Sequence, residues 1–486
     1  MRNFLLAVLS MMALGAWAHD FSVDGIYYNI TDSTARQVAV TYQGSSYTTA
    51  AYSGDVVIPS EVTYNDTAYT VTSIGDYALR SCGGVTSVSI PETVTYIGTT
   101  AFGQCTSLTA AVIPGSVTSM GNSVFSKCTA LSDVTLGAGL TSTGSTTFSG
   151  CTSLAGITIP DNITSVGSYC FQYSGLESIS LGDSLASVGT YAFSYCESLA
   201  DVSISNISDL ANYSFYGSTG VKNVKIKGVG DANIGTYCFH SCSGMETLSV
   251  EGVDTIGTYA FANCTSLSDI TLAEGLETIM TYAFYNDSAF TGVDIPVSVG
   301  YIGGYAFRNC SKLAEIAIPG NGETVLDGRV FQGCWGLRKV TFGTGVANIK
   351  GGFYYQCDSI TDFYSLSATP PSLTITALST YLFNNSTLHV PQGCAETYAS
   401  TSVWLKFANI VDDIEEESLV AEVSADSSGP AVYAANGQIV VEGSTGDVEI
   451  YTIGGALIYR GRGGAIDARG GVYIVKTAGK AVKVAL

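Results

Sequence analysis

The sequence is poor in charged side chains, and in basic ones above all. Charged residues make up 13% of its 486 residues, about half the share of an average soluble domain. Lys and Arg number 20 against 41 Asp and Glu, so the formal net charge is −21 at pH 7. Nucleic-acid phosphates and anionic membrane surfaces repel such a chain. We therefore expect no nucleic-acid partner.

Histidine is scarce as well, which leaves few ways to build a catalytic or metal site. The chain has three, His19, His240 and His389, and none is spaced from a Ser, Cys or carboxylate as in a nucleophilic site. No Gly-x-Ser-x-Gly elbow and no Cys-x-x-Cys pair occurs, and Cys238 and Cys242 with His240 are too sparse for zinc. The sequence therefore predicts no enzyme, no metal and no cofactor. A hydrolase with carboxylates paired only by the fold is a formal alternative.

No apolar run is long enough to span a bilayer. Near the N-terminus, Arg2 precedes the short apolar stretch 4–16, and Ala16-Trp17-Ala18 follows with the small-x-small pattern of a cleavage site. Residues 1–18 are therefore predicted to be a signal peptide. The mature protein is expected to be exported, without direct membrane insertion after cleavage.

The dominant feature of the sequence is a repeat of 22–24 residues. A short strand is predicted from Leu-x-x-Val-x-Ile, which alternates with period two and ends at Pro or Gly. Val-x-x-Ile-Gly-x-x-Ala then leads to a large apolar anchor on the far side of the coil. One unit cannot bury its apolar face alone, so the units must stack as a β-rich solenoid of about thirteen coils. The anchors are Leu79, Phe102, Phe125, Phe148, Phe171, Phe193, Phe215, Phe239, Phe261, Phe284, Phe307, Phe331 and Phe353.

These motifs resemble the leucine-rich repeats of BspA-type surface proteins of bacteria, over roughly residues 56–411. The resemblance implies a curved solenoid with a parallel sheet, and a location on the bacterial cell surface or outside the cell. It also implies a non-catalytic scaffold for adhesion that binds a host or bacterial surface protein. It names no ligand, because individual members bind different partners. The alternative function is a structural envelope protein that associates with itself.

The segments that flank the repeats predict caps. Residues 19–70 alternate like strands and are expected to cover the N-terminal edge of the solenoid, which spans residues 71–365. Residues 366–411 predict a C-terminal cap, with Leu388–Pro391 as its last strand and Trp404 as an apolar lid.

A separate module is predicted at the C-terminus. An acidic linker is expected at residues 412–430, and a small β domain at residues 431–486 whose strands 471–476 and 481–484 form a closing hairpin. This domain resembles the C-terminal sorting domains of type IX secretion, which implies a use in surface sorting. A β module without a sorting role is the alternative.

Thirteen cysteines in an exported protein suggest disulfides at first, but their positions indicate otherwise. Nine of them lie three residues after an anchor and Cys357 lies four after, while Ser174, Ser218 and Asp287 take the same place in other coils. A place that accepts Cys or Ser is a small, half-polar packing site. The pattern therefore predicts a ladder of buried thiols.

Two sets of residues are candidate protein-binding sites. The first is a Tyr two residues before the anchor in seven consecutive coils, which stacking would align into a ladder that either stabilises the coils or forms an interface. The second is basic and would either steer an acidic partner or only keep its strands soluble. The tyrosines are Tyr169, Tyr191, Tyr213, Tyr237, Tyr259, Tyr282 and Tyr305, and the basic residues are Lys222, Lys225 and Lys227 in one coil and Arg338 and Lys339 in another.

Overall fold

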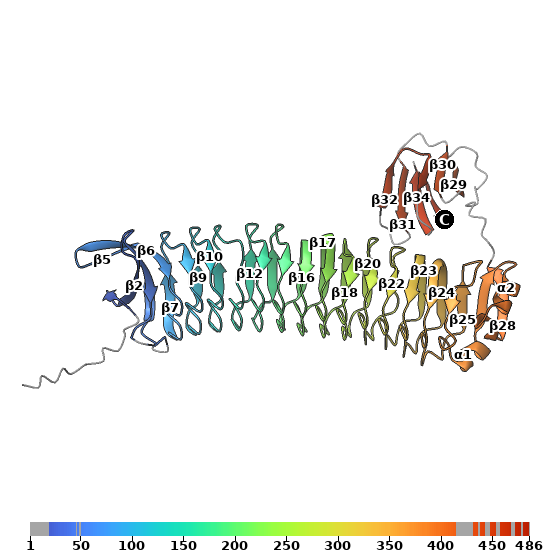
Figure 1. Cartoon of the computed structure of the whole chain (residues 1–486), viewed down its shortest axis with the longest axis horizontal. Coiled ribbons are helices and arrows are strands. Elements are labelled where there is room, and N and C mark those ends of the chain that lie inside the picture. The colour runs from blue at the N-terminus through green and yellow to red at the C-terminus, as the bar shows by residue number, and fades with distance from the viewer. Residues whose placement is uncertain are drawn as a thin grey trace, which may run out of the picture. The chain divides into compact units, whose positions relative to one another are not determined.

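The chain forms a parallel β-solenoid followed by a small β domain (Figure 1). It divides into two units, Met1–Leu176 and Glu177–Leu486, which we describe one at a time. The predicted signal peptide and residues 415–430 of the predicted linker lie outside the described residues. The computed structural model describes residues 19–44, 46–47, 50–414, 431–435, 438–442, 448–452, 457–467, 472–477 and 480–485.

The first unit begins with a β cap. Antiparallel pairs join β1 to β2, β2 to β3 and β5 to β6, and β6 lies parallel to β3. The Phe21 ring stacks on Tyr64 with their centroids 4.2 Å apart. Strands are thus present where the alternation predicts them, and the last one crosses the expected boundary at residue 70. They are β1 (Phe21–Val23), β2 (Ile26–Asp32), β3 (Gln37–Thr41), β4 (Ser53–Val57), β5 (Glu61–Tyr64) and β6 (Thr67–Ile74).

Most of the following coils of this unit have two strands where the sequence predicts one, and the coil that starts at residues 133–135 has only an isolated bridge from Ser142 to Ser165 in its second row. The Leu-x-x-Val-x-Ile segments give β7 (Gly84–Ser89), β9 (Ala110–Val112), β11 (Asp133–Thr135) and β12 (Gly156–Ile159). The Val-x-x-Ile segments give β8 (Tyr96–Ile97), β10 (Ser119–Met120) and β13 (Ser165–Val166). Pairing between coils is parallel, as in β9 with β11 and β8 with β10. Two residues are too few to show a strand period, so the second row is invisible in the sequence.

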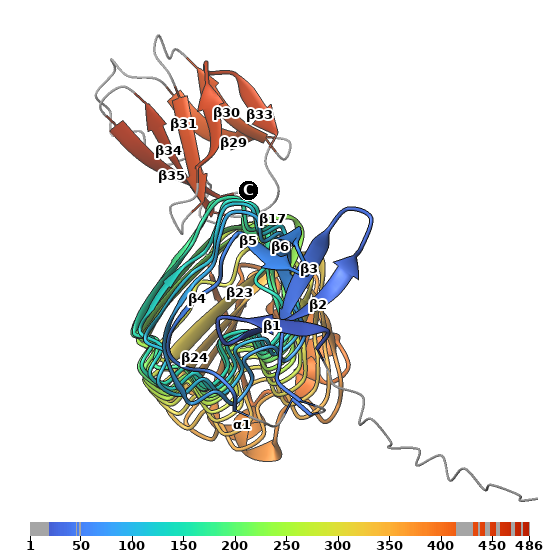
Figure 2. The ribbon, with the colours of Figure 1, turned by 90° about the vertical axis from the view of Figure 1, so that its left-hand side faces the viewer.

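The second unit repeats this plan, and its successive coils superpose when viewed along the stack (Figure 2). Four strands are long enough to run through both rows, namely β16 (Asp201–Leu210), β17 (Asn223–Ile234), β23 (Glu315–Leu326) and β24 (Lys339–Ile349). The others in the first row are β14 (Ser178–Leu181), β18 (Thr247–Glu251), β20 (Asp269–Leu272) and β25 (Asp362–Ser365). Those in the second row are β15 (Ser187–Val188), β19 (Thr255–Ile256), β21 (Thr278–Ile279), β22 (Tyr301–Ile302) and β26 (Ser372–Leu373).

A cap of short helices and two strands closes the solenoid at its C-terminal end. The predicted lid, Trp404, is 1% exposed, and its Nε1–H donates to the carbonyl of Pro371 at 2.8 Å. None of the helices in the described residues is long and apolar enough to cross a membrane. The elements are α1 (Thr380–Asn385), β27 (Thr387–Pro391), α2 (Ala395–Ser400), the 3-10 helix η1 (Trp404–Lys406) and β28 (Asn409–Ile414).

The prediction that Leu388–Pro391 is the last strand of the cap is wrong. β27 covers these residues, but β28 pairs with it in parallel and runs to Ile414, three residues into the predicted linker. The acidic pair Asp412-Asp413 made this segment resemble a solvated linker. The structure instead holds Asp413 on the strand, where its carboxylate accepts a hydrogen bond from His389 Nδ1 at 2.8 Å.

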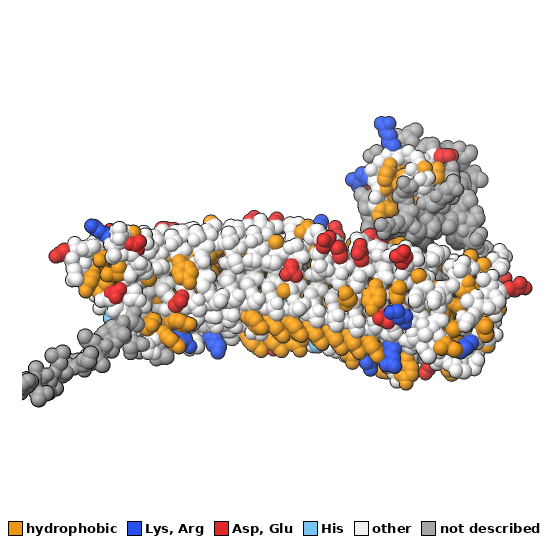
Figure 3. Space-filling model, in the orientation of Figure 1, with side chains coloured by type: hydrophobic (Ala, Val, Ile, Leu, Met, Phe, Trp, Pro, Cys, Tyr) orange, Lys and Arg blue, Asp and Glu red, His pale blue; other side chains and the backbone are white. Residues whose placement is uncertain are grey.

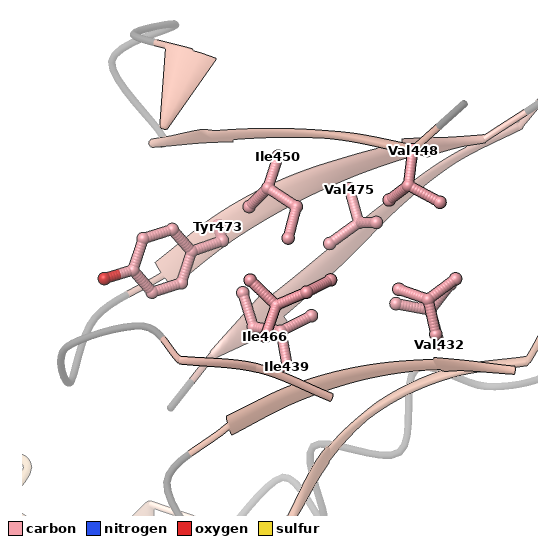
Figure 4. Packing of buried hydrophobic residues seen from close by; sticks show 8 residues of the cluster. Val432, Ile439, Val448, Ile450, Ile466, Tyr473 and Val475 are labelled. Atoms are coloured by element: carbon pink, nitrogen blue, oxygen red, sulfur yellow. The ribbon is translucent and has the colours of Figure 1, made fainter. Parts of the chain in front are cut away.

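The C-terminal domain has a core of its own. One sheet has the order β29–β30–β33 and the other β32–β31–β34–β35, and the predicted closing hairpin is β34 with β35. Val432 and Ile439 of the first sheet face Val448, Ile450 and Val475 of the second (Figure 4). The strands are β29 (Ala431–Ala435), β30 (Gln438–Glu442), β31 (Val448–Thr452), β32 (Leu457–Gly461), β33 (Ala465–Asp467), β34 (Val472–Thr477) and β35 (Lys480–Ala485).

The anchors form the centre of the solenoid core in both units. In the first unit, the rings from Phe102 to Phe171 stack with centroids 5.2–5.6 Å apart. In the second, the rings from Phe193 to Phe331 stack at 4.7–5.5 Å. All are 0% exposed. Truncating one such ring to Ala costs about 3–5 kcal/mol in a typical core, so each coil depends strongly on its neighbours.

The cysteines form the expected ladder beside the anchors. Twelve of the thirteen thiols are buried and Cys394 is partly exposed. Typically the thiol donates to the carbonyl of the preceding coil's anchor, as Cys128 Sγ does to Phe102 at 3.1 Å. Ser218 Oγ makes the equivalent bond to Phe193 at 2.7 Å. The position therefore requires a small hydrogen-bond donor, which explains why Cys and Ser alternate there.

Asp287 departs from this rule. Its side chain is 0% exposed, and Oδ1 accepts from the Cys264 N–H at 2.8 Å, while Oδ2 is buried without a hydrogen-bond partner. Burial raises the pKa of Asp287 well above its ordinary value of 3.8. The same coil is irregular farther along, where residues 291–295 form only an isolated bridge from Asp294 to Ala317.

The row of buried thiols predicts that the folded and the unfolded protein differ strongly in the number of reactive cysteines. Because burial raises the pKa of thiols such as Cys151 (to about 12), little reactive thiolate is present at neutral pH. We expect one rapidly reacting thiol, Cys394, in the native protein, and thirteen in denaturant without reductant. Absorbance titration with an aromatic disulfide reagent measures both counts. Several fast native thiols, or fewer than thirteen in denaturant, would contradict the ladder of buried thiols.

The buried carboxyl of Asp287 is expected to lower the free energy of unfolding as pH rises. Because folding raises its pKa, the carboxyl destabilises the folded state increasingly as pH rises above 3.8. Asp287→Ser, which supplies the hydroxyl that Ser218 provides elsewhere, should raise the free energy of unfolding. The gain should grow by up to about 1.4 kcal/mol per pH unit from acid toward neutral pH. Urea unfolding at several pH values measures it.

The matched control is Asp358→Ser, which removes an exposed carboxylate from a neighbouring part of the solenoid. It should leave the pH dependence unchanged. An equal gain for Asp287→Ser at acidic and neutral pH would show that the buried carboxyl is not the cause.

Candidate functional site

The predicted tyrosines line a turn in six consecutive coils of the second unit. Their rings stack face to face, with centroids 4.5–5.0 Å apart and interplanar angles of 11° or less. All six side chains are half-buried. We call these residues the tyrosine ladder: Tyr191, Tyr213, Tyr237, Tyr259, Tyr282 and Tyr305. The seventh predicted tyrosine, Tyr169, belongs to the first unit and is 38% exposed.

Every ladder tyrosine has a left-handed backbone. Their φ angles are 55° to 62°, a conformation that costs a non-glycine residue about 1 kcal/mol. The first unit makes the same turn with Thr100, Ser123 and Thr146, at φ 55° to 59°. The turn thus requires this backbone conformation but no aromatic ring. The reason for tyrosine must lie in what the ring itself does.

Stacking determines which part of each ring reaches the surface. Because neighbouring rings cover each other's faces, the ladder presents ring edges and phenol groups toward solvent. Burial and the neighbouring phenols raise the pKa of Tyr237 and Tyr259, so these hydroxyls keep their protons at neutral pH. An aromatic edge carries partial positive charge. The exposed chemistry of the ladder therefore favours oxygen acceptors.

Two arginines stand at the C-terminal end of the ladder. The guanidinium of Arg308 lies 5.6 Å from the ring centroid of Tyr285 and 5.5 Å from that of Tyr305. Arg329 takes the ladder position in the next coil, and its Nη1 donates to the Tyr305 hydroxyl at 2.8 Å. Sequence reasoning missed both residues. Arg329 could have been found by following the ladder position one coil farther, since it lies two residues before Phe331.

A second row of side chains runs beside the ladder. The rings of Tyr216 and His240 stack with centroids 5.2 Å apart, and burial lowers the pKa of His240. His240 Nε2 lies 3.1 Å from Asn263 Nδ2, and Asn286 Nδ2 donates to Asn263 Oδ1 at 2.9 Å. This row is polar and uncharged in character at neutral pH, so it extends the hydrogen-bonding surface of the ladder.

The first basic group lies on the strand face of the solenoid, not on the turns. Lys222, Lys225 and Lys227 are exposed at the start of β17. Lys227 Nζ forms an ion pair with Glu251 at 3.5 Å. In the pairing register Lys225 is flanked by serines on both sides. Only part of this predicted basic site is therefore neutralised.

The second basic group lies at the start of β24. Arg338 and Lys339 are both exposed, and Lys339 Nζ lies 4.9 Å above the ring of Tyr364. Glu315 and Asp362 flank Lys339 in the register. β18, β20, residues 291–295 and β23 separate this group from the lysines of β17. The structure thus does not bring the two predicted basic groups together.

A hollow of about 400 Å³ opens on the strand face over the irregular coil. Asp269, Glu315 and Lys339 line it, together with Asp294. Gly292 also lines it, and a Cβ there would meet no atom within 4 Å. The hollow could not be predicted from the sequence, because the strand pattern indicates a side chain in this row.

The remaining candidate for polar chemistry is His389. Its ring stacks on Tyr364 with centroids 4.3 Å apart, and its nitrogens contact Asp413 at 2.8 Å and Asp362 at 3.2 Å. These residues come from β25, β27 and β28, so the imidazole ties the last strands together. Across the described part of the chain, no three His, Cys, Asp or Glu side chains are placed to hold a metal ion.

Comparison with known proteins identifies the repeat. A family profile described as the BspA type leucine rich repeat region matches residues 60–176, 130–246 and 232–361, which together span more than half of the chain. Among curated proteins, none matches significantly.

Several solved structures are similar in fold. A leucine-rich repeat protein from Bacteroides ovatus is 27% identical, with 66% of this chain and 94% of that chain covered and a TM-score of 0.47. A leucine rich cell surface protein from Faecalibacterium prausnitzii is 26% identical, with the same coverage and a TM-score of 0.39. The pneumococcal vaccine antigen PcpA is 18% identical, with 82% and 98% covered and a TM-score of 0.39.

Proposed function

Because the chain belongs to the BspA-type leucine-rich repeat family, we propose that it is an exported, surface-displayed scaffold that binds other proteins and has no catalytic activity. A leucine-rich repeat solenoid is a protein-interaction scaffold in general character. Export rests on the predicted signal peptide at residues 1–18. Display rests on the family resemblance and on the likeness of residues 431–486 to sorting domains.

The observation that carries the proposal is the tyrosine ladder. Six consecutive coils place a bulky ring at a backbone conformation that three consecutive coils of the first unit fill with Thr or Ser. Tyrosine is the residue type that interfaces favour, since it adds a large, rigid contact area with a polar end. A continuous row of such side chains offers an extended binding surface for a protein partner. The exposed Lys222 and Lys225, and Arg338, would assist by steering acidic regions toward the solenoid.

Replacing three adjacent ladder residues tests this role. In Tyr237→Ser, Tyr259→Ser and Tyr282→Ser combined, the turn keeps a residue type that the first unit already uses at φ > 0. We expect the solenoid to remain folded and capture of envelope or host surface proteins to fall at least about tenfold, as when interface hot spots are removed. Circular dichroism measures folding, and quantitative pull-down with the mature full-length chain measures capture.

The matched control changes Thr100, Ser123 and Thr146 to Ala, at the equivalent turns of the first unit. It should leave capture unchanged. A folded tyrosine variant that captures as much as wild type contradicts the proposal. An unfolded one would show that the ladder holds the coils together, and the triple Tyr→Phe variant, which keeps the rings, then tests the hydroxyls alone. Concentration-dependent assembly of the wild type without capture would favour the self-associating structural protein.

A further inference from the structure

The turns around the anchors, which include the ladder, differ in charge from the strand face of the solenoid. The whole chain has 41 acidic residues. In eight coils of the second unit, the positions from three before the anchor to two after it contain no Asp or Glu at all. These segments are residues 190–195, 212–217, 236–241, 258–263, 281–286, 304–309, 328–333 and 350–355. In a strongly acidic protein, the turns around the anchors thus carry no negative charge while the strand face does. Four turns of the first unit, residues 99–104, 122–127, 145–150 and 168–173, lack acids as well, so what distinguishes the ladder is its row of tyrosines and the arginines at its end.

Figure 3 shows the same separation on one face of the molecule. Hydrophobic side chains, which include tyrosine, form a band along one edge of the solenoid, and basic side chains stand where the band ends. The acidic side chains in that region lie mostly toward the opposite edge. Solubility alone does not require this separation, because acidic side chains scattered over the whole surface would keep the protein equally soluble.

One of the three basic residues of this surface is neutralised and two are not. Lys350 forms an ion pair with Asp327, 3.4 Å away, just outside the acid-free segments. Arg308 and Arg329 form no ion pair within the described part of the chain. Both guanidinium groups instead lie within 5.8 Å of the ring centroid of Tyr305. The two like charges repel each other, and an anion that bound between them would relieve this repulsion.

The geometry of the ladder also limits the kind of ligand. Sugars and nucleobases bind aromatic residues through the ring face, and here neighbouring rings cover the faces at 4.5–5.0 Å. The ring edges and the guanidinium groups carry positive charge or partial charge, and each phenol hydroxyl has one proton to donate. A partner rich in carboxylates and backbone carbonyls complements all three. An extended acidic polypeptide has both groups along its whole length.

We propose that the tyrosine ladder, with Arg308 and Arg329 at its end, binds an acidic segment of a partner protein. This inference rests on the proposed function and adds the chemistry of the partner. The phenol row contacts the backbone carbonyls of the segment. The two arginines bind its carboxylates through charge-assisted hydrogen bonds, which planar guanidinium groups make in bidentate form.

The test uses fluorescently labelled poly-L-glutamate as the probe and the mature full-length protein. Wild type should bind the probe, and binding should weaken as ionic strength rises because exposed charges are screened. Arg308→Glu combined with Arg329→Glu should weaken binding by about tenfold or more, since it replaces two charge-assisted contacts by repulsion. The triple Tyr→Ser variant should also weaken it. Fluorescence anisotropy measures each affinity.

The control reverses two exposed bases away from the ladder, Arg36→Glu and Lys406→Glu. It makes the same change in net charge and should alter the affinity less than about threefold, because long-range effects are screened. Equal loss in both double variants would overturn the assignment to the ladder, as would a wild type that does not bind the probe.

Two results separate this inference from the proposed function. If pull-down still captures proteins but poly-L-glutamate does not bind, the scaffold role stands and the acidic partner is wrong. If polygalacturonate binds more tightly than poly-L-glutamate, and the arginine variant loses it, the surface takes an anionic polysaccharide and the polypeptide assignment is overturned.

Discussion

The whole structure depends on hydrogen bonds that each coil makes with the next one. The peptide of an anchor shows this most directly. The Phe102 N–H donates to the carbonyl of Val124 in the following coil, and the Phe102 carbonyl accepts from the thiol of Cys128 in that coil. Both groups are buried. The N–H relies on the next coil for its partner, while the carbonyl also accepts from the Cys105 N–H of its own coil at 3.1 Å. Leaving one unsatisfied costs about 1–3 kcal/mol, so a coil is stable only between two others, and the caps are as necessary as the repeats.

The irregular coil shows what happens when this constraint is relaxed. Asp287 places a carboxyl where most coils have the hydrogen-bond donor of a Cys or Ser. Phe290 stands where most coils have Leu, and its ring stacks on Phe307 with the centroids 5.9 Å apart. A few residues later the strand is reduced to a single bridge, and Gly292 leaves the hollow on the strand face. The interruption is tolerated because the anchors Phe284 and Phe307 still stack at 5.3 Å on either side of the irregular segment. Stacking of the anchors therefore stabilises this coil where its strand makes few backbone hydrogen bonds to the neighbouring coils.

The sequence allowed the repetitive part of this structure to be predicted, and little of what breaks the repeat. A fixed spacing places equivalent residues above one another, so the stacked anchors, the buried thiols and the alignment of the tyrosines followed from counting alone. The two-residue strands did not, because they are shorter than any detectable period. β28 did not either, because its acidic pair Asp412-Asp413 is typical of a linker, whereas the backbone pairs with β27 and the Asp413 carboxylate bonds to His389. The meeting of Arg308 and Arg329 at Tyr305 is a matter of side-chain direction, which spacing does not determine.

The fold separates the residues that hold it together from those that can change. The anchor and the thiol position face the core and must keep their size and their hydrogen-bonding group. The turn position two residues earlier needs only a backbone at positive φ, which Thr100 and Tyr259 satisfy equally well at 55°. Since residues as different as Thr and Tyr adopt this backbone, the conformation alone does not select the aromatic ring, and stacking and binding can decide between a small hydroxyl and a tyrosine. Residues at the turns can therefore change from coil to coil without altering the core beneath them. The row of tyrosines that ends in Arg308 and Arg329 is one surface formed in this way.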